Sequence, residues 1–233
     1  MSCGLRRGLP SWRHTDPHTE SPHSERQPLM GKLVVLTFVS LDGVHQGPGG
    51  PQEDTRDGFG QGGWSVPYLD DDFGRFVDGV FSRVGAFLLG RRTYDIFAAS
   101  WPKVTDPADP VAGKLNTLPK YVASTTLQDP AWANTTVIGG DLAKEVTVLK
   151  ERTDGELQVH GSGDLARSLF ALGLVDTLHL LTYPVVLGAG RRLFPEGSTP
   201  TAFRHTGGET TSKGVSVRTY DVAGRPAYGE YEL

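Results

Sequence analysis

Three glycine-containing turns follow hydrophobic stretches of this chain, and each resembles an anion-binding turn. They are residues 89–94 (LGRRTY), 160–165 (HGSGDL) and 186–192 (VLGAGRR). Glycine lets a backbone approach a ligand closely, and the first N–H groups of a helix point at a bound anion. Two of the turns also carry paired arginines, which suit phosphate. Together they predict a site for a large phosphorylated ligand such as a dinucleotide.

The first turn leads into a predicted helix that begins with two positive charges. Arg91 and Arg92 would oppose the helix dipole there, and an anionic ligand would remove that conflict. Gly90 and Thr93 on either side also suit a phosphate. The alternative is that both arginines face solvent or pair with acids such as Asp95.

The second turn matches the dinucleotide fingerprint G-x-G-x-x-A over residues 161–166 (GSGDLA). A classical dinucleotide-binding fold also needs an acid about 20 residues further on, and residues 181–183 (LTY) contain none. A phosphate-binding turn remains, beside the alternative of a tight strand-to-helix turn with Asp164 in the first helical turn.

Further candidate residues follow other strands. The hydroxyls of Ser124 and Thr125 suit either an adenosine 2′-phosphate or the capping of a turn. Asp42 and Trp64 flank a long loop, residues 43–63, which contains eight glycines. Trp64 suits core packing or stacking on a flat heterocycle equally well. Loops of this length in compact domains are often functional.

The predicted elements alternate between strand and helix and end in a hairpin. Strands are expected at 32–39, 86–89, 120–123, 135–138, 156–160 and 177–186, and helices at 68–83, 91–99, 141–152 and 164–172. A loop is expected around Pro107 and Pro110. Residues 201–211 and 214–222 are expected to form two antiparallel strands. This order predicts an α/β fold, with a mostly parallel sheet and antiparallel strands at one edge. Ligands in such sheets bind beyond the carboxyl ends of the strands, where the three turns lie.

Composition excludes several classes of protein. The net charge of −4 does not favour nucleic-acid binding, and no apolar run approaches the roughly 20 residues of a membrane span. The single cysteine and the histidine spacing predict no metal site, and a reducing, cytoplasmic setting fits.

Residues 1–29 have four prolines and no signal-peptide pattern, so we expect a disordered tail or non-native extension before one domain, 30–233.

The ordered set of motifs resembles the dihydrofolate reductase superfamily. It consists of SLDG at 40–43, the long loop ending at Trp64, GRRTY at 90–94, GSGDLA at 161–166 and PVVLGAGRRLF at 184–194. Over residues 31–222 the chain is most similar to the reductase domain of the riboflavin-biosynthesis deaminase-reductase and its stand-alone relatives. The resemblance implies a three-layer fold, NADPH as cofactor, a small-molecule substrate and a homodimer.

The resemblance also implies roles for individual residues. Gly90, Arg91, Arg92 and Thr93 would hold cofactor phosphates, and Ser124 and Thr125 its adenosine end. The pyrophosphate would lie on the second turn, formed by Gly161, Ser162, Gly163, Asp164 and Leu165. Trp64, Tyr68 and His160 would face the substrate. Asp70 or Asp42 would supply a catalytic carboxylate, with Asp71 as the alternative to Asp70 after the segment 64–67 (WSVP). Burial of Asp70 or Asp71 in the crevice would raise its pKa and suit it to proton delivery.

One residue departs from the pattern of the riboflavin enzymes. They carry an acid that faces the substrate where this chain has His160, so we expect weak or no activity on the phosphoribosylamino-pyrimidine. The alternative is that His160 only ties the strand end to a neighbouring loop. The function expected is therefore an NADPH-dependent reductase of a heterocyclic or carbonyl substrate. Dihydrofolate reduction proper and non-catalytic NADPH binding remain alternatives.

Overall fold

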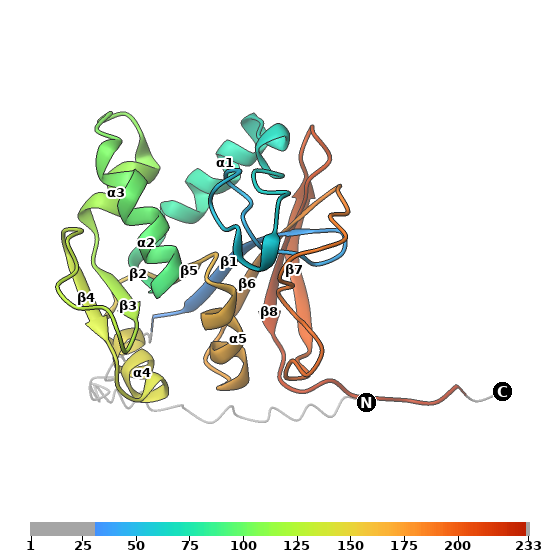
Figure 1. The fold of residues 1–233 in the computed structure, drawn as a ribbon. Coiled ribbons are helices and arrows are strands. Elements are labelled where there is room, and N and C mark those ends of the chain that lie inside the picture. Colours follow the sequence, from blue (N-terminus) through green and yellow to red (C-terminus); the bar gives the residue numbers. More distant parts are fainter. Residues whose placement is uncertain (1–30, 232–233) are drawn as a thin grey trace, which may run out of the picture.

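An eight-stranded sheet crosses the protein, which a computed structural model describes from residue 31 to residue 231 (Figure 1). The strands are β1 (Leu33–Ser40), β2 (Val84–Gly90), β3 (Lys120–Ala123), β4 (Thr135–Ile138), β5 (Glu156–His160), β6 (Thr177–Tyr183), β7 (Phe203–Thr210) and β8 (Ser216–Val222). They lie in the order β4-β3-β2-β5-β1-β6-β8-β7. Strands β1 to β6 are parallel to one another, and β8 and β7 add an antiparallel edge next to β6. The predicted α/β fold is confirmed.

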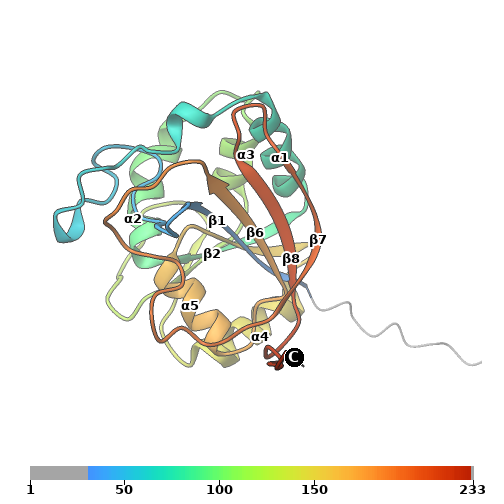
Figure 2. The ribbon, with the colours of Figure 1, turned by 90° about the vertical axis from the view of Figure 1, so that its right-hand side faces the viewer.

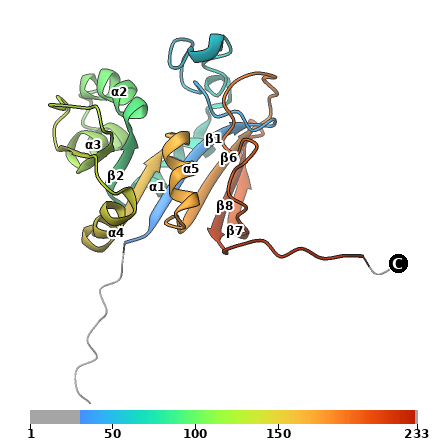
Figure 3. The same ribbon diagram turned by 60° about the horizontal axis from the view of Figure 1, so that its bottom comes forward.

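Five α-helices within this range cover both faces of the sheet (Figure 3). They are α1 (Asp71–Phe81), α2 (Arg91–Ser100), α3 (Pro110–Thr117), α4 (Leu142–Arg152) and α5 (Gly163–Ala171). Helices α4 and α5 pack on one face, and α1, α2 and α3 pack on the other. The result is three layers, with the sheet in the middle.

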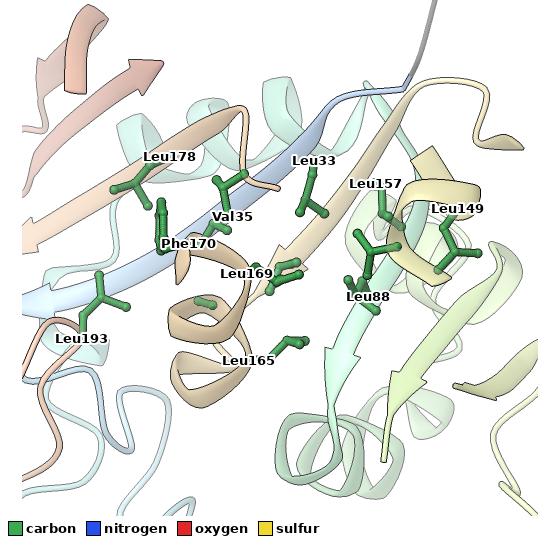
Figure 4. Packing of buried hydrophobic residues seen from close by; sticks show 14 of the residues in the cluster. Leu33, Val35, Leu88, Leu149, Leu157, Leu165, Leu169, Phe170, Leu178 and Leu193 are labelled. Atoms are coloured by element: carbon green, nitrogen blue, oxygen red, sulfur yellow. The ribbon is translucent and has the colours of Figure 1, made fainter. Parts of the chain in front are cut away.

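The largest core lies between the sheet and helices α4 and α5 (Figure 4). Leu33 and Val35 of β1 contribute to it, and Leu36 on the other face of β1 joins a second cluster. A strand buried on both faces needs a near-continuous apolar run, which residues 33–39 supply. Strand β1 therefore lies near the middle of the sheet, between β5 and β6.

Two helical segments differ from the sequence-based expectation. The region of Pro107 and Pro110, expected to be a loop, contains α3, whose Asp109 caps the first turn and whose Pro110 occupies the first helical position. The helix expected over 68–83 is split into a 3-10 turn, Val66–Tyr68, and α1. The break occurs because the Asp70 side chain accepts the Phe73 N–H as an N-cap.

The parallel strands bring several loops to one edge of the sheet. Strands β1, β2 and β5 end there at Ser40, Gly90 and His160, so the long loop 43–63 and the first two glycine turns meet. Figure 2 shows the long loop beside the segment that follows β6. The expected tail, residues 1–29, lies outside the described residues.

Candidate functional site

A cavity of about 1170 Å³ lies at the carboxyl ends of β1, β2 and β5. The first two glycine turns, part of the long loop and helices α1, α2 and α3 contribute to its walls. Of the residues expected to bind a cofactor, nine line it: Gly90, Arg91, Arg92, Thr93, Gly161, Ser162, Gly163, Asp164 and Leu165. The topology therefore brings together two sequence motifs that are about 70 residues apart.

Two helices that begin at this cavity lack a side-chain cap. Helices α1, α3 and α4 each begin after an aspartate whose carboxylate accepts N–H groups of the first turn. Helix α2 follows Gly90 and α5 follows Ser162, and neither residue caps its helix with a side chain. Uncapped first-turn N–H groups carry partial positive charge and suit an anion. The two helix starts are therefore candidate phosphate sites.

Hydrogen bonds join the two helix starts to each other. The Ser162 hydroxyl accepts the Gly90 N–H at 3.0 Å and bonds the Thr93 hydroxyl at 2.8 Å. The Ser162 N–H also reaches the Thr93 hydroxyl. Ser162 has φ 43°, a left-handed conformation that serine rarely adopts, and these bonds hold it there. Thr93 and Ser162 thus fix the spacing of both helix N-termini.

The paired arginines have partners on the protein, as one alternative anticipated. Arg91 bonds Asp95 one helical turn later at 2.9 Å, and Arg92 lies 3.8 Å from Asp54. Both arginine side chains remain about half exposed and line the cavity. Exposed pairs of this kind are weak, so a phosphate can compete for either guanidinium.

The long loop closes one side of the cavity and is fixed by Gln46. The Gln46 amide donates to the backbone oxygens of Asp54 and Arg56, and its Oε1 accepts the Arg191 N–H at 3.0 Å. Trp64 is buried, and its indole N–H donates to the Gln46 backbone oxygen at 2.8 Å. Trp64 therefore supports the loop and does not line the cavity.

Two buried polar atoms of the cavity wall have no hydrogen-bond partner among residues 31–231. They are the Thr37 hydroxyl, on β1, and Nε2 of His45, on the long loop. Burial lowers the pKa of His45 to about 4, so the ring is neutral at pH 7. The ring lies against Gly163, where any side chain would collide with it. Buried polar groups are rarely left unpaired, so both atoms indicate a ligand.

Asp42 lies outside the cavity wall and fixes the third glycine turn. Its carboxylate accepts the backbone N–H groups of Leu187 and Gly188 at 3.1 and 2.9 Å and the Ser40 hydroxyl at 2.6 Å. The Ser40 bond, followed by the two backbone bonds, lowers the pKa of Asp42 to about 2. The third turn therefore binds a carboxylate of this chain, which differs from the expected phosphate. Asp42 stays ionised and does not suit proton delivery.

Asp70 and Tyr68 also lie outside the cavity wall. Asp70 accepts N–H groups of Phe73 and Lys213, and the Phe73 bond is the main cause of its lowered pKa. The expectation that burial raises this pKa is not met, because Asp70 caps α1. Tyr68 packs on the buried Tyr183 with ring centroids 5.9 Å apart.

The hydroxyl pair after β3 is placed differently from the expectation. The Ser124 hydroxyl accepts the N–H groups of Thr126 and Leu127 in a turn, and Thr125 is exposed. Neither Ser124 nor Thr125 lines the cavity. The structure therefore favours the turn-capping alternative for Ser124.

His160 lines the cavity at the end of β5 and is buried. Its Nε2 is 3.0 Å from Oε1 of Gln158, and its ring packs against Phe81 and Phe87. Burial, assisted by the charge of His179, lowers the pKa of His160 to about 3. The cavity therefore meets a neutral imidazole at the position where an acid is expected in the riboflavin enzymes.

Among residues 31–231, four carboxylates line the cavity, and three of them pair with arginine. Asp54 binds Arg56, Asp95 binds Arg91, and Asp164 binds Arg167. The fourth is Glu53, which has no arginine or lysine partner among residues 31–231 and accepts the Gly49 N–H. Burial raises the pKa of Glu53. Glu53 is therefore the cavity carboxylate best suited to carry a proton.

Sequence reasoning identified the long loop as functional but did not single out His45, Gln46, Glu53 or Thr37. The available signal was the presence of polar residues in a glycine-rich loop after a buried strand. No helix in the part of the chain described is long and apolar enough to cross a bilayer.

The chain is similar to a protein family, to a bacterial relative and to several solved structures. A family model described as the RibD C-terminal domain matches residues 31–217. An uncharacterized protein of Bacillus subtilis, YyaP, is 28% identical over 191 residues, which cover 81% of this chain and 94% of the relative. A putative riboflavin biosynthesis protein from Shewanella has the same fold, with TM-score 0.63 and 20% identity over 82% of this chain and 98% of that protein. Dihydrofolate reductase from Enterococcus faecalis, solved with NADP(H), has TM-score 0.51 and 13% identity over 84% of this chain and 98% of that enzyme. The predicted family resemblance and the dihydrofolate-reductase-like fold are confirmed.

Proposed function

The chain belongs to the RibD C-terminal domain family, and we propose that it is an NADPH-dependent reductase of a small heterocyclic or carbonyl compound. The observation that carries the proposal is the pair of uncapped helix N-termini, α2 and α5, at one cavity. NADP(H) in the solved structure of the Enterococcus dihydrofolate reductase supports the same cofactor. Family membership supports a reductase of the riboflavin-pathway type.

The residues of the cavity fit such a cofactor. Gly161 to Leu165 would hold the pyrophosphate at the start of α5, and Arg91 and Arg92 would neutralise the remaining phosphate charge. Thr37 and His45 offer unpaired polar atoms to the uncharged part of the cofactor. When bound, the reduced nicotinamide supplies a hydride, and the protein orients the reactants and excludes water.

The proton that accompanies the hydride needs a source within the cavity. Glu53 fits this role because burial raises its pKa and its charge is not neutralised by an arginine. Asp42 and Asp70 do not fit, since hydrogen bonds to backbone N–H groups stabilise their ionised forms. We therefore assign the general-acid role to Glu53 in place of either aspartate.

Titration of the protein with NADPH and NADH tests the cofactor assignment. We expect NADPH to bind at least about tenfold more tightly, because one charge-assisted phosphate contact contributes about 1.5–3 kcal/mol. Arg91→Ala and Arg92→Ala should each weaken NADPH binding, whereas Arg152→Ala at the far end of α4 should not. Equal affinities for both cofactors, or unchanged NADPH binding in both variants, would refute the assignment.

Two further properties follow from the family as proposals. We propose that the protein acts on a small molecule in the cytoplasm and that it forms a homodimer. Sedimentation equilibrium measures the mass in solution, and a single species at the monomer mass of 25.2 kDa contradicts the dimer.

A further inference from the structure

The part of the cavity between α1, the last turn of α2 and α3 is apolar. Along α2 the cavity wall changes from Arg91, Arg92 and Asp95 in the first turns to Phe97 in the last turn. We call the apolar part the chamber, and its walls come from helices α1, α2 and α3 and the turn after α2. The chamber residues are Val77, Phe81, Phe97, Trp101, Val111 and Leu115.

The chamber residues form a continuous hydrophobic wall. Phe81 and Leu115 are buried core residues, and the other four are partly buried and pack against the same core cluster. The rings of Phe97 and Trp101 lie edge to face, 6.2 Å apart. Val66 and Leu69, which precede α1, also line the cavity and are 46% and 40% exposed. Apolar surface left open beside a polar cofactor site is typical of a binding site for an apolar group.

Within the described part of the chain, no charged side chain of the chamber could neutralise an anionic substrate. The cationic residues of the cavity wall are Arg56, Arg91 and Arg92, on the long loop and the first turn of α2. Helices α1 and α3 contribute only apolar residues. His160, beside Phe81, is neutral and already bonded to Gln158. A phosphate or carboxylate in the chamber would lose its hydration without gaining a partner.

We propose that the substrate is an uncharged, largely apolar carbonyl or imine compound with a flat ring that lies in the chamber. The proposal rests on the proposed function, which assigns the glycine turns to the cofactor and leaves the chamber for the substrate. For a carbonyl, the hydride from the reduced nicotinamide forms the new C–H bond and a proton adds to oxygen. The products are an alcohol and the oxidised cofactor.

Calorimetric titration with two product-like alcohols tests this proposal without turnover. The probes are 2-naphthalenemethanol and its carboxylate analogue 6-(hydroxymethyl)-2-naphthoate, each added to the protein with and without NADP⁺. We expect the neutral alcohol to bind at least about tenfold more tightly. Equal affinities, tighter binding of the carboxylate, or no binding of the neutral alcohol at about 1 mM overturns the proposal. Titration of NADPH itself is a separate measurement, so failure of the cofactor assignment is distinguishable.

Variants locate the binding site of the neutral alcohol. Val77→Arg places a cation in the chamber, so it should weaken binding of the neutral alcohol at least about tenfold and strengthen binding of the carboxylate. Val148→Arg, at an exposed position of α4 outside the cavity, should change neither. Val111→Arg on α3 repeats the test if circular dichroism shows that Val77→Arg is unfolded. Unchanged affinities in a folded chamber variant overturn the proposal.

Discussion

At the scale of single residues, Gly163 shows how a glycine motif acts through a neighbour. A Cβ at Gly163 would lie 2.3 Å from Cε1 of His45, so Gly163→Ala forces the imidazole to turn. We expect this variant to bind NADPH at least about tenfold more weakly, with little change in melting temperature. Gly113→Ala in α3 is the control, because no other atom lies within 4 Å of the position that the new Cβ would take. Alanine there should stabilise the helix by about 0.5–1 kcal/mol. Fluorescence titration measures the NADPH affinity of both variants. Equal NADPH affinities of Gly163→Ala and Gly113→Ala would contradict the role of His45.

Glu53 provides the second test at this scale. Glu53→Gln removes the proton but keeps the shape, so we expect kcat to fall by about 10²–10⁴ with NADPH affinity unchanged. Glu151→Gln, on the exposed surface of α4, is the matched control. In the unmodified protein, activity should fall as pH rises through the pKa of Glu53, because a general acid must be protonated. A Glu53→Gln variant with an unchanged pH–rate profile would exclude this residue as the acid.

At the scale of elements, Gln46 joins the long loop to Arg191, which lies far along the chain. Gln46→Ala removes the bonds to Asp54, Arg56 and Arg191, so it leaves buried backbone groups unpaired at a cost of about 1–3 kcal/mol. We expect faster hydrogen exchange throughout residues 44–63 and weaker NADPH binding. Gln61→Ala is the control in the same loop, since Gln61 is exposed. Equal exchange in both variants would show that Gln46 does not hold the loop.

At the scale of the whole molecule, buried neutral histidines make stability depend on pH. The pKa of His160 and His179 is lowered from 6.5 to about 3 and about 4, mainly by burial. The unfolded chain therefore binds more protons below pH 6.5, and stability is lost as pH falls from 6.5 toward the folded values. Each histidine should contribute up to about 1.4 kcal/mol per pH unit in this range.

Urea denaturation between pH about 7.5 and 5 measures this slope. His179→Gln should reduce the slope, because it removes one titrating group. His205→Gln, at an exposed position of β7, is the control substitution. Stability that stays constant across this range would contradict neutral burial of the two histidines.

The N-terminal extension is tested on the same scale. A protein that begins at Met30 should keep its melting temperature and its NADPH affinity, because residues 1–29 lack the apolar content of a packed segment. A loss of about 1 kcal/mol would lower the melting temperature by about 2–4 °C in a protein of this size. A larger drop would indicate that the extension packs on the domain.

The sequence alone determined the features that depend on neighbours along the chain. The apolar run 33–39 indicated a strand buried on both faces, and the glycine turns at 90 and 161 indicated helix starts suited to an anion. The alternation of strands and helices was sufficient to predict a mostly parallel sheet, because parallel strands need crossover connections, which are usually helices. Asp109 before Pro110 is also a readable helix start, because aspartate suits the N-cap and proline suits the first helical position.

Only the tertiary structure decided which charged residues reach the cavity. Asp42 and Glu53 are both acids near one loop, but backbone N–H groups 145 and 146 residues away bind Asp42, whereas Glu53 lines the cavity. The same distant segment fixes Gln46 through Arg191. The direction and the pKa of a side chain in a loop depend on such long-range hydrogen bonds. The spacing of residues along the chain does not reveal these bonds. The apolar chamber likewise exists only where α1, α2 and α3 converge in space.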